Sequence, residues 1–492
     1  MFFTQIAQFM LLAEIFPYAH QVFVGLTVLY FLTILGIIGV VVSENRNPVK
    51  SLAWVTVLLL LPVVGMVLYL FFGRSLKSVR MISRRNRQAL RSREEFPTID
   101  IDSLPLTTES KQIIRLVGRL GGCHYFPGNS IDVFTAGRDK MQALMRDIAA
   151  ARSYVHLQYY IFEDDATGRA LADLLIEKVR QGVKVRVIYD HVGSFRLNAR
   201  LFKRMRRAGV EAYPFLKVTF PELANRINWR NHRKIVVIDG RIGYIGGMNI
   251  ADRYVRATRR GGEAWRDTHL RVVGEAVAGF EYSFAVDWNF TCHQLLGEPT
   301  VHYQGVRHDA PDGVQLVRSG PTGKWSNISL VLLKAISGAK SRVYVQTPYF
   351  LPNDSLLKAL QAAALAHIDV RLMIPRDPDA KILKYASYSY VRECLDAGIK
   401  VYFYEPAMLH AKLILVDDEF TTTGSTNFDF RSFEHNFECN ALVYSRQFNA
   451  RMAAVFASDM RQCTRINPGL WHKRPLRHKV YESIVRLMSP VL

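Results

Sequence analysis

Cysteine is scarce in this chain, and its five cysteines follow no metal-binding pattern. Cys123, Cys292, Cys394, Cys439 and Cys463 show no CxxC spacing and no accompanying histidine pattern, so a zinc site is not supported. An odd number of cysteines fits free thiols in a reducing compartment. We therefore expect no metal site and no bound cofactor.

Charge is missing from two long stretches near the amino terminus. Residues 21–43 and 51–73 contain no charged residue, and each exceeds the roughly 20 apolar residues that span a bilayer as a helix. The residues before them lack the basic segment of a cleaved signal peptide. We predict a retained transmembrane helical hairpin, with Pro62 tolerated inside the second helix. Residues 1–18, interrupted by Pro17, are interpreted as a candidate interfacial helix.

Acidic residues are outnumbered, with 43 Asp and Glu against 64 Lys and Arg, for a formal net charge of +21. Eight basic residues fall within residues 74–93, directly after the second apolar stretch. The positive-inside rule then places this flank and the rest of the chain on the cytoplasmic side of the membrane, as a multi-pass protein. Basic residues there attract anionic lipid, so we expect membrane lipid and no nucleic acid as the partner.

The most informative pattern, His-x-Lys-x4-Asp, occurs twice: as His232, Lys234 and Asp239, and as His410, Lys412 and Asp417. Each copy is followed at the same distance by a turn of small residues, 246–249 and 424–427, that ends in asparagine. A single copy carries a real risk of chance occurrence. Two copies with matching turns indicate two half-sites that meet in one place.

Strand geometry explains the spacing of this pattern. Both copies lie on runs rich in branched aliphatic residues, which predicts buried strands, and side chains at i and i+2 share one face of a strand. A lysine can hold phosphoryl oxygens, while a histidine can act as nucleophile or general acid. The turns add neutral donors, so we predict that Asn249, Ser425 and Asn427 bind phosphate. With two half-sites, one histidine attacks phosphorus while the other protonates the leaving oxygen.

The duplication extends through the predicted secondary structure. Residues 153–162 match 342–351, residues 183–190 match 368–375, and residues 201–215 match 390–404. Alternating helix and strand signals predict an α/β sheet with helices on both faces, formed twice.

The two motifs resemble those of the phospholipase D superfamily, and the whole chain, with its hydrophobic amino-terminal region, is similar to bacterial membrane-bound cardiolipin synthases. The resemblance implies two pseudo-symmetric phospholipase D-like α/β halves and a metal-free, ping-pong phosphatidyl transfer through a phosphohistidine. We expect a membrane region at 1–73, a basic linker at 74–120, halves at 121–300 and 301–465, and a tail at 466–492. The tail is interpreted as basic and amphipathic, with a solvated basic face left open as the alternative.

Four acidic residues receive different interpretations. Asp267 and Glu438 occupy matching places after the motif copies, and the superfamily pattern supports a role in orienting the histidines. The motif residues Asp239 and Asp417 belong to the candidate catalytic set by pattern, but we interpret them as structural, either anchoring a turn or pairing with a cation.

The resemblance implies transfer of a phosphatidyl group between two phosphatidylglycerol molecules, which gives cardiolipin and glycerol. By the same analogy His232 is the nucleophile and His410 the acid and base, although the near symmetry leaves the reverse assignment open. The motifs do not distinguish this activity from a hydrolytic phospholipase D or from transfer to another alcohol. A nuclease is disfavoured by the apolar region, and a non-catalytic scaffold by two intact motifs. The sequence leaves open whether the chain forms homo-oligomers.

Overall fold

The computed structural model describes residues 18–43, 48–73, 76, 79–91, 99–194, 199–218, 228–257, 262–296 and 312–489. The chain divides into two compact units, of which the first combines 1–75 with 219–228 and the second combines 76–218 with 229–492. The predicted interfacial helix falls, apart from residue 18, outside the described residues. The predicted boundary between the halves, at 300 and 301, also lies outside them.

The first unit contains the long apolar helix α2 (Ala19–Ser43). Its 25 residues extend about 37 Å at 1.5 Å per residue, which exceeds the roughly 30 Å of a bilayer core. Within the described part of the chain it is the one helix long and apolar enough to cross a membrane, by length and composition.

The second apolar stretch folds back on itself. It forms α3 (Pro48–Leu60), α4 (Pro62–Leu68) and the π-helical turn η1 (Tyr69–Gly73). The rings of Trp54 and Tyr69 lie 5.3 Å apart, whereas a straight helix would separate these positions by about 22 Å. The prediction of one helix over 51–73 is therefore wrong, because Pro62 cannot donate to the preceding turn and Leu61 leaves the helical conformation (φ −130°, ψ 67°).

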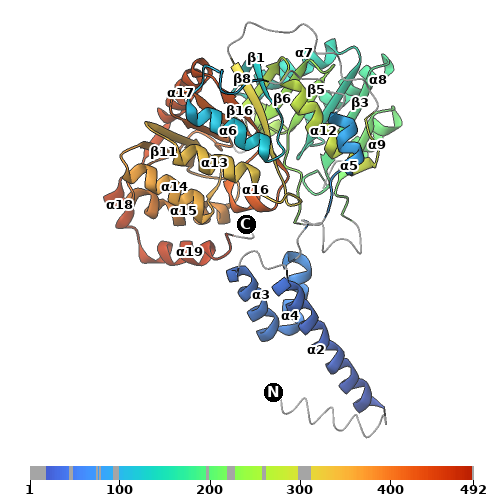
Figure 1. Cartoon of the computed structure of the whole chain (residues 1–492), viewed down its shortest axis with the longest axis vertical. Coiled ribbons are helices and arrows are strands. Elements are labelled where there is room, and N and C mark those ends of the chain that lie inside the picture. Colours follow the sequence, from blue (N-terminus) through green and yellow to red (C-terminus); the bar gives the residue numbers. More distant parts are fainter. Residues whose placement is uncertain are drawn as a thin grey trace. The chain divides into compact units, whose positions relative to one another are not determined.

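The second unit consists of two halves with the same order of elements, which Figure 1 draws mainly in green for the first half and in orange to red for the second. Helices α5 (Arg84–Arg91) and α6 (Thr108–Arg119) precede them. The first half contains β1 (Tyr125–Phe134), α7 (Gly137–Ala150), β2 (Tyr154–Tyr159), α8 (Ala166–Arg180), β3 (Lys184–Asp190), α9 (Ala199–Arg207), β4 (Glu211–Phe215), β5 (Ile235–Ile238), β6 (Ile242–Gly246), α11 (Asp252–Val255), β7 (His269–Val273) and α12 (Val277–Cys292).

The second half repeats this series and adds short strands. It contains β8 (Asp312–Ser319), α13 (Asn327–Ser337), β9 (Arg342–Gln346), β10 (Phe350–Leu351), α14 (Asp354–Leu365), β11 (Asp369–Pro375), α15 (Lys381–Asp396), β12 (Lys400–Tyr404), β13 (Leu413–Val416), β14 (Phe420–Gly424), β15 (Phe428–Asp429), α16 (Phe430–Glu434), β16 (Glu438–Tyr444), α17 (Arg446–Met460) and β17 (Cys463–Arg465). The tail forms α18 (Pro468–His472) and α19 (Leu476–Arg486).

One continuous sheet joins the halves, with the order β17-β12-β11-β9-β13-β14-β16-β8-β1-β7-β6-β5-β2-β3-β4. The antiparallel pair β1–β8 forms its centre. Counted outward from this pair, β1-β7-β6-β5-β2-β3-β4 in one half corresponds to β8-β16-β14-β13-β9-β11-β12 in the other. The predicted fold of two pseudo-symmetric α/β halves is confirmed.

Strand register corrects one of the sequence matches. Gln158 pairs with Ile235 and Gln346 with Leu413, the residues that follow the two motif lysines. Residues 153–162 therefore correspond to 341–350, one position away from the match made by sequence. Strand β2 is buried along its whole length, so its apolar pattern alone does not determine register.

Helices cover both faces of the sheet, as predicted. Ile235 and Val237 of β5 belong to a core cluster with α12 and α17. The alternate residues Val236 and Ile238 pack in a cluster with α7, α8 and α9. Because successive side chains of a strand point to opposite faces, each motif strand directs its histidine and lysine to one side and the residue between them to the other.

Candidate active site

The two halves are joined by short parallel bridges next to the motifs. Asn231 pairs with Phe437, and Arg266 pairs with Leu409. In each bridge one partner immediately precedes a motif histidine, and the other immediately precedes an acidic residue of the opposite half. The backbone therefore brings each histidine to the acid of the other half.

The histidine–carboxylate pairs are crossed between the halves. His232 Nδ1 lies 3.0 and 3.2 Å from the two carboxylate oxygens of Glu438, and His410 Nδ1 lies 2.6 Å from Oδ2 of Asp267. All four side chains are buried. The predicted pairing partners are thus brought together, but each acid contacts the histidine of the other motif copy.

The His232–Glu438 pair is strongly polarised. Glu438 also accepts hydrogen bonds from Ser425 Oγ and from Asn436 Nδ2, the latter at 3.2 Å. Burial opposes ionisation of Glu438, but His232, Lys234 and Ser425 outweigh it and hold the pKa of this carboxyl below its usual range. Burial lowers the pKa of His232 to about 4, against the opposing attraction of Glu438. The imidazole is therefore neutral at pH 7, donates from Nδ1, and keeps a lone pair on Nε2.

The His410–Asp267 pair differs from the first pair in the pKa of its carboxyl group. Asp267 accepts from the amide of Thr268 at 2.7 Å, yet burial raises the pKa of its carboxyl to about 6. Burial, reinforced by the charge of Lys412, lowers the pKa of His410 well below its usual value. Tyr254 OH lies 3.3 Å from His410 Nδ1. The carboxyl of Asp267 therefore lies closer to protonation at neutral pH than that of Glu438, whose pKa is held below its usual range.

A single cavity of ≈ 480 Å³ receives both histidines. Its lining includes Asn249 and Asn427, the predicted phosphate-binding asparagines, and four aromatic side chains: Tyr160, Tyr254, Trp265 and Tyr349. Three arginines, Arg230, Arg253 and Arg431, and two aspartates, Asp379 and Asp429, complete the charged part of the lining. A cavity with aromatic walls and convergent cations suits a phosphate ester with apolar substituents.

The motif lysines lie behind the histidines rather than in the lining of the cavity. Lys234 Nζ donates to the carbonyl of His232 at 2.6 Å, and Lys412 Nζ lies 2.8 Å from Nδ1 of His410. Burial lowers the pKa of Lys234 to about 7 and that of Lys412 to about 8. An anion in the cavity would stabilise the charged form of both lysines.

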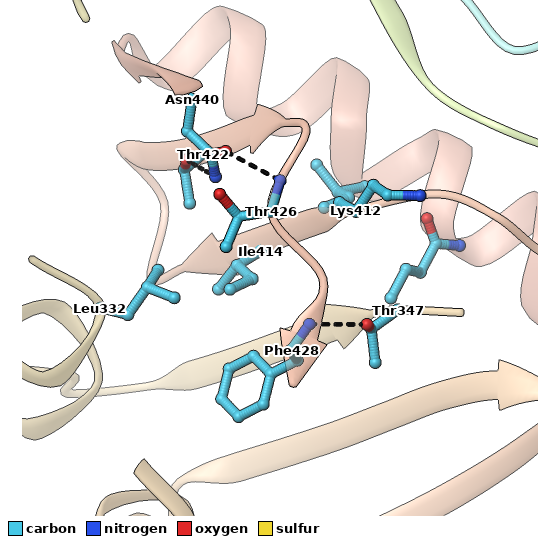
Figure 2. A pocket seen from close by; sticks show the side chains of 10 residues that line it. Leu332, Thr347, Lys412, Ile414, Thr422, Thr426, Phe428 and Asn440 are labelled. Atoms are coloured by element: carbon cyan, nitrogen blue, oxygen red, sulfur yellow. Dashed lines mark hydrogen bonds between the residues drawn. The ribbon is translucent and has the colours of Figure 1, made fainter. Parts of the chain in front are cut away.

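The turn that carries Asn427 is held on both sides. Asn440 Oδ1 accepts from the amide of Thr426 at 3.3 Å, and Thr347 Oγ1 accepts from the amide of Phe428 at 2.9 Å. Figure 2 shows both bonds around a small cavity of ≈ 10 Å³, with the ammonium of Lys412 pointing away from Thr426. Asn427 itself enters the large cavity, and its Oδ1 is buried without a partner among the described residues.

Ser425 is not a phosphate ligand in this geometry. Its Oγ donates to Oε2 of Glu438 and accepts from the amide of Cys439 at 2.9 Å. The side chain is fully buried and is absent from the lining of the cavity. The prediction that Ser425 binds phosphate is wrong, because its hydroxyl supports the carboxylate that contacts His232.

The motif aspartates lie at the opposite end of their strands. Asp239 accepts from the backbone amides of Arg152, Ser153 and Tyr154 at 2.8–2.9 Å. Asp417 accepts in the same way from residues 340–342. A four-residue strand separates each aspartate from its lysine, about 13 Å of chain. The structure removes both from the catalytic set and supports the anchoring interpretation, with backbone amides instead of a cation as partners.

Comparison with known proteins assigns the family. The family described as "Cardiolipin synthase, PLD-like domain" matches residues 144–277 and 332–460, and "Phospholipase D-nuclease N-terminal" matches residues 28–74. The chain is 40% identical over 460 residues to the cardiolipin synthase of Geobacillus kaustophilus, covering 92% of this chain and 91% of that protein. This chain belongs to the cardiolipin synthase family. It is also 38% identical over 476 residues to the major cardiolipin synthase of Bacillus subtilis, covering 95% and 98% of the two chains.

A solved structure is similar to the fold of this family member. The crystal structure of the phosphatidylserine synthase of Haemophilus influenzae aligns with a TM-score of 0.59 at 14% identity, covering 77% of this chain and all of that one. At this identity the likeness concerns the fold. Family membership confirms the predicted resemblance and membrane association, with α2 as the candidate anchor.

The three arginines of the cavity were not predicted from the sequence. Arg230, Arg253 and Arg431 line the cavity, but none lies within a motif. Arg230 precedes His232 by two positions on the same extended segment, a spacing that would have indicated a shared face. Arg253 and Arg431 lie on helices of four and five residues, and no periodic signal marks such short elements.

Proposed function

We propose that this chain is a cardiolipin synthase that transfers a phosphatidyl group between two phosphatidylglycerol molecules, releasing glycerol. The observation that carries the proposal is the pair of buried histidine–carboxylate contacts facing one cavity. Such an arrangement supplies one nucleophile and one proton carrier, which is the requirement of a double-displacement phosphoryl transfer. The family assignment is the independent support.

In the first step, Nε2 of His232 attacks the phosphorus of a phosphatidylglycerol molecule. The P–O bond to glycerol breaks, and the glycerol oxygen takes a proton from His410. The histidine becomes a phosphatidyl-imidazole cation, and the carboxylate of Glu438 at Nδ1 stabilises this charge. His232 suits this role because Glu438 is held ionised by several donors and keeps the proton of the imidazole on Nδ1.

In the second step, His410 removes the proton from the primary hydroxyl of another phosphatidylglycerol. That oxygen attacks phosphorus, the P–N bond breaks, and His232 recovers its lone pair as cardiolipin forms. His410 suits proton transfer because its partner Asp267 has a pKa of about 6. The phosphodiester anion adds negative charge beside His410 and so favours its protonated form.

The remaining groups of the cavity fit the substrate. Asn249 and Asn427, with Arg230 and Arg431, supply donors for the phosphoryl oxygens. The free Oδ1 of Asn427 and the carboxylate of Asp379, which accepts from Tyr349 OH at 2.6 Å, supply acceptors for glycerol hydroxyls. Both lysines lie behind the histidines and contribute positive charge to the loaded site.

We further propose that the protein works at the inner face of a bacterial cytoplasmic membrane, anchored through α2. The predicted multi-pass anchor reduces to one crossing together with the folded-back α3 and α4, since the 13 residues of α3 reach only about 20 Å. The basic flank after residue 73 favours the cytoplasmic side. Fusing a cytoplasm-specific reporter after residue 489 tests the orientation, and a silent reporter there would contradict it.

The test of the reaction is incubation of purified full-length protein with phosphatidylglycerol alone, followed by mass spectrometry of the lipid products. Cardiolipin with an equal amount of free glycerol is the expected result. Phosphatidic acid as the main product would identify a hydrolase instead. The His410→Ala variant provides the control for uncatalysed exchange.

A further inference from the structure

A second cavity, of ≈ 330 Å³, lies beside the active site and shares none of its lining residues. The segment 231–233 separates the two: His232 faces the active-site cavity, while Arg233 lines the second one. The second cavity is formed by α5 and the residues before it, by α12, and by the loop 318–327 that leads into α13. We call it the basic cavity.

The basic cavity has a large excess of positive charge. Arg80, Arg87, Arg318 and Lys324 line it, and within the described ranges none of the four forms an ion pair with a carboxylate. Asp287 is the acidic residue of the lining, and it is already bound to the guanidinium of Arg233. These four cations repel each other around the cavity. A bound anion would relieve this repulsion, so the arrangement favours anion binding.

A buried hydroxyl lies in the wall of the basic cavity. Ser319 is 5% exposed, and its Oγ has no hydrogen-bond partner among the residues described. Buried hydroxyls without a partner are uncommon, because desolvation costs free energy that a hydrogen bond would recover. Asn327, the first residue of α13, also lines the cavity. The amino-terminal end of this helix therefore adds its partial positive charge.

An exposed aromatic side chain indicates what kind of anion fits. Trp325 lines the basic cavity with 52% of its surface exposed, and the ammonium of Lys324 lies 5.0 Å from its ring centre. Tryptophan beside basic residues is typical of protein surfaces at the level of lipid headgroups. Val79 and Arg80, which also line the cavity, follow the apolar amino-terminal stretch by only six residues in sequence.

We propose that the basic cavity binds the phosphate of an anionic phospholipid headgroup, as a site separate from the catalytic one. The choice of a membrane lipid over free phosphate rests on the membrane function proposed above. Arg318, Lys324 and the Ser319 hydroxyl hold the phosphate, Arg80 and Arg87 add positive charge from α5 and the residues before it, and Trp325 contacts the glycerol backbone region of the lipid.

Occupancy of this site affects a segment that serves catalysis. Arg233 donates to the carbonyls of Ser319 and Glu438, each at 3.1 Å. A headgroup bound at Ser319 therefore stabilises the strand pair β8–β16 at the end where Glu438 meets His232. The bound lipid thereby helps to hold Glu438 in its position next to His232.

The experiment uses full-length protein carrying His232→Ala, so that bound lipid is not turned over. Native mass spectrometry in a neutral detergent counts molecules of dioleoyl phosphatidylglycerol per chain during a titration. We expect two binding events, of which Lys324→Gln weakens one by about fivefold, the equivalent of about 1 kcal/mol per basic residue. Arg318→Gln should weaken the same event. Arg138→Gln, which removes an exposed basic residue from α7, is the matched control and should change neither.

Unchanged binding in both Lys324→Gln and Arg318→Gln would overturn the proposal. Lys324 is exposed, so its variant remains informative if Arg318→Gln misfolds. Displacement of the lipid by inorganic phosphate at equal concentration would identify a free-phosphate site and overturn the lipid assignment. Because binding is measured without turnover, a protein that makes no cardiolipin yet shows this loss would refute the proposed function and leave the basic cavity as a lipid site.

Discussion

Glu438→Gln is the substitution that tests the crossed histidine pairs most directly. It preserves side-chain volume but replaces a carboxylate that accepts from His232 Nδ1, Ser425 Oγ and Asn436 Nδ2. A glutamine has one acceptor oxygen, and its amide must donate. The amide facing His232 would then donate to Nδ1, which moves the imidazole proton to Nε2. The atom that should attack phosphorus would no longer carry a lone pair.

The expected loss follows from this change of tautomer and from the missing counter-charge. A wrong tautomer at a comparable histidine–carboxylate pair lowers kcat about 10⁴-fold, or about 5.5 kcal/mol of transition-state stabilisation. The effect on folding should be smaller, about 1–3 kcal/mol for one polar group left poorly satisfied. Thermal unfolding in detergent, monitored by circular dichroism, separates the two effects.

A substrate with an activated leaving group distinguishes attack from protonation. Phosphatidyl-p-nitrophenol needs no general acid for departure, so release of p-nitrophenol in a first turnover reports nucleophilic attack alone. We expect this first-turnover release of p-nitrophenol, the burst, to be lost in Glu438→Gln and His232→Ala. The burst should be retained in Asp267→Asn and His410→Ala. A normal burst in Glu438→Gln, with its loss in Asp267→Asn, would refute the reasoning and reverse the histidine roles.

Four further predictions concern the rest of the chain. Activity should survive exhaustive chelation, because the described residues contain no cluster of His, Cys, Asp and Glu able to hold a metal; loss restored by one stoichiometric metal would contradict this. Asp239→Ala should lower stability by about 2–4 kcal/mol, since three backbone amides lose a charged acceptor, while kcat at 20 °C stays within about threefold; a collapse of kcat with unchanged melting temperature would return Asp239 to the catalytic set. Burial lowers the pKa of His232 from 6.5 to about 4, so between these pH values the folded state binds fewer protons than the unfolded state. The free energy of unfolding therefore falls as the pH falls. Thermal melts at pH 4–7 should show a smaller fall in His232→Asn. Ile484→Glu on α19, where Ile484 is 55% exposed, should weaken binding of the enzyme's tail to anionic vesicles in flotation assays, and unchanged flotation would favour a solvated basic face.

Local patterns were sufficient for the fold class and for most of the site. The duplicated His-x-Lys-x4-Asp pattern lies on short buried strands, and strand periodicity is a property of adjacent residues. The pattern therefore indicated both histidines and the two equivalent halves, while the acids Asp267 and Glu438 were indicated by their matching places after the motifs and by the superfamily resemblance. Apolar runs likewise indicated α2, because helix length and hydropathy are also local quantities.

Other features required the assembled chain. The prediction of one helix over 51–73 failed because hydropathy does not reveal that Pro62 begins a second helix packed against the first. Ser425 was assigned to phosphate by its place in a turn, but the neighbouring strand β16 brings Glu438 to its hydroxyl. The cavity arginines come from short segments whose positions depend on both halves.

By itself the sequence determined a duplicated α/β unit with two histidine motifs and an apolar amino-terminal region, because motif spacing and hydropathy are properties of residues close together in the chain. Only the tertiary structure decided that Glu438 contacts His232 and Asp267 contacts His410. The reason is that the central β1–β8 pair and the bridges at Asn231 and Leu409 exchange partners between halves. A pseudo-symmetric sequence is equally compatible with each histidine contacting the acid of its own half. The packing of the two halves decides between these two pairings.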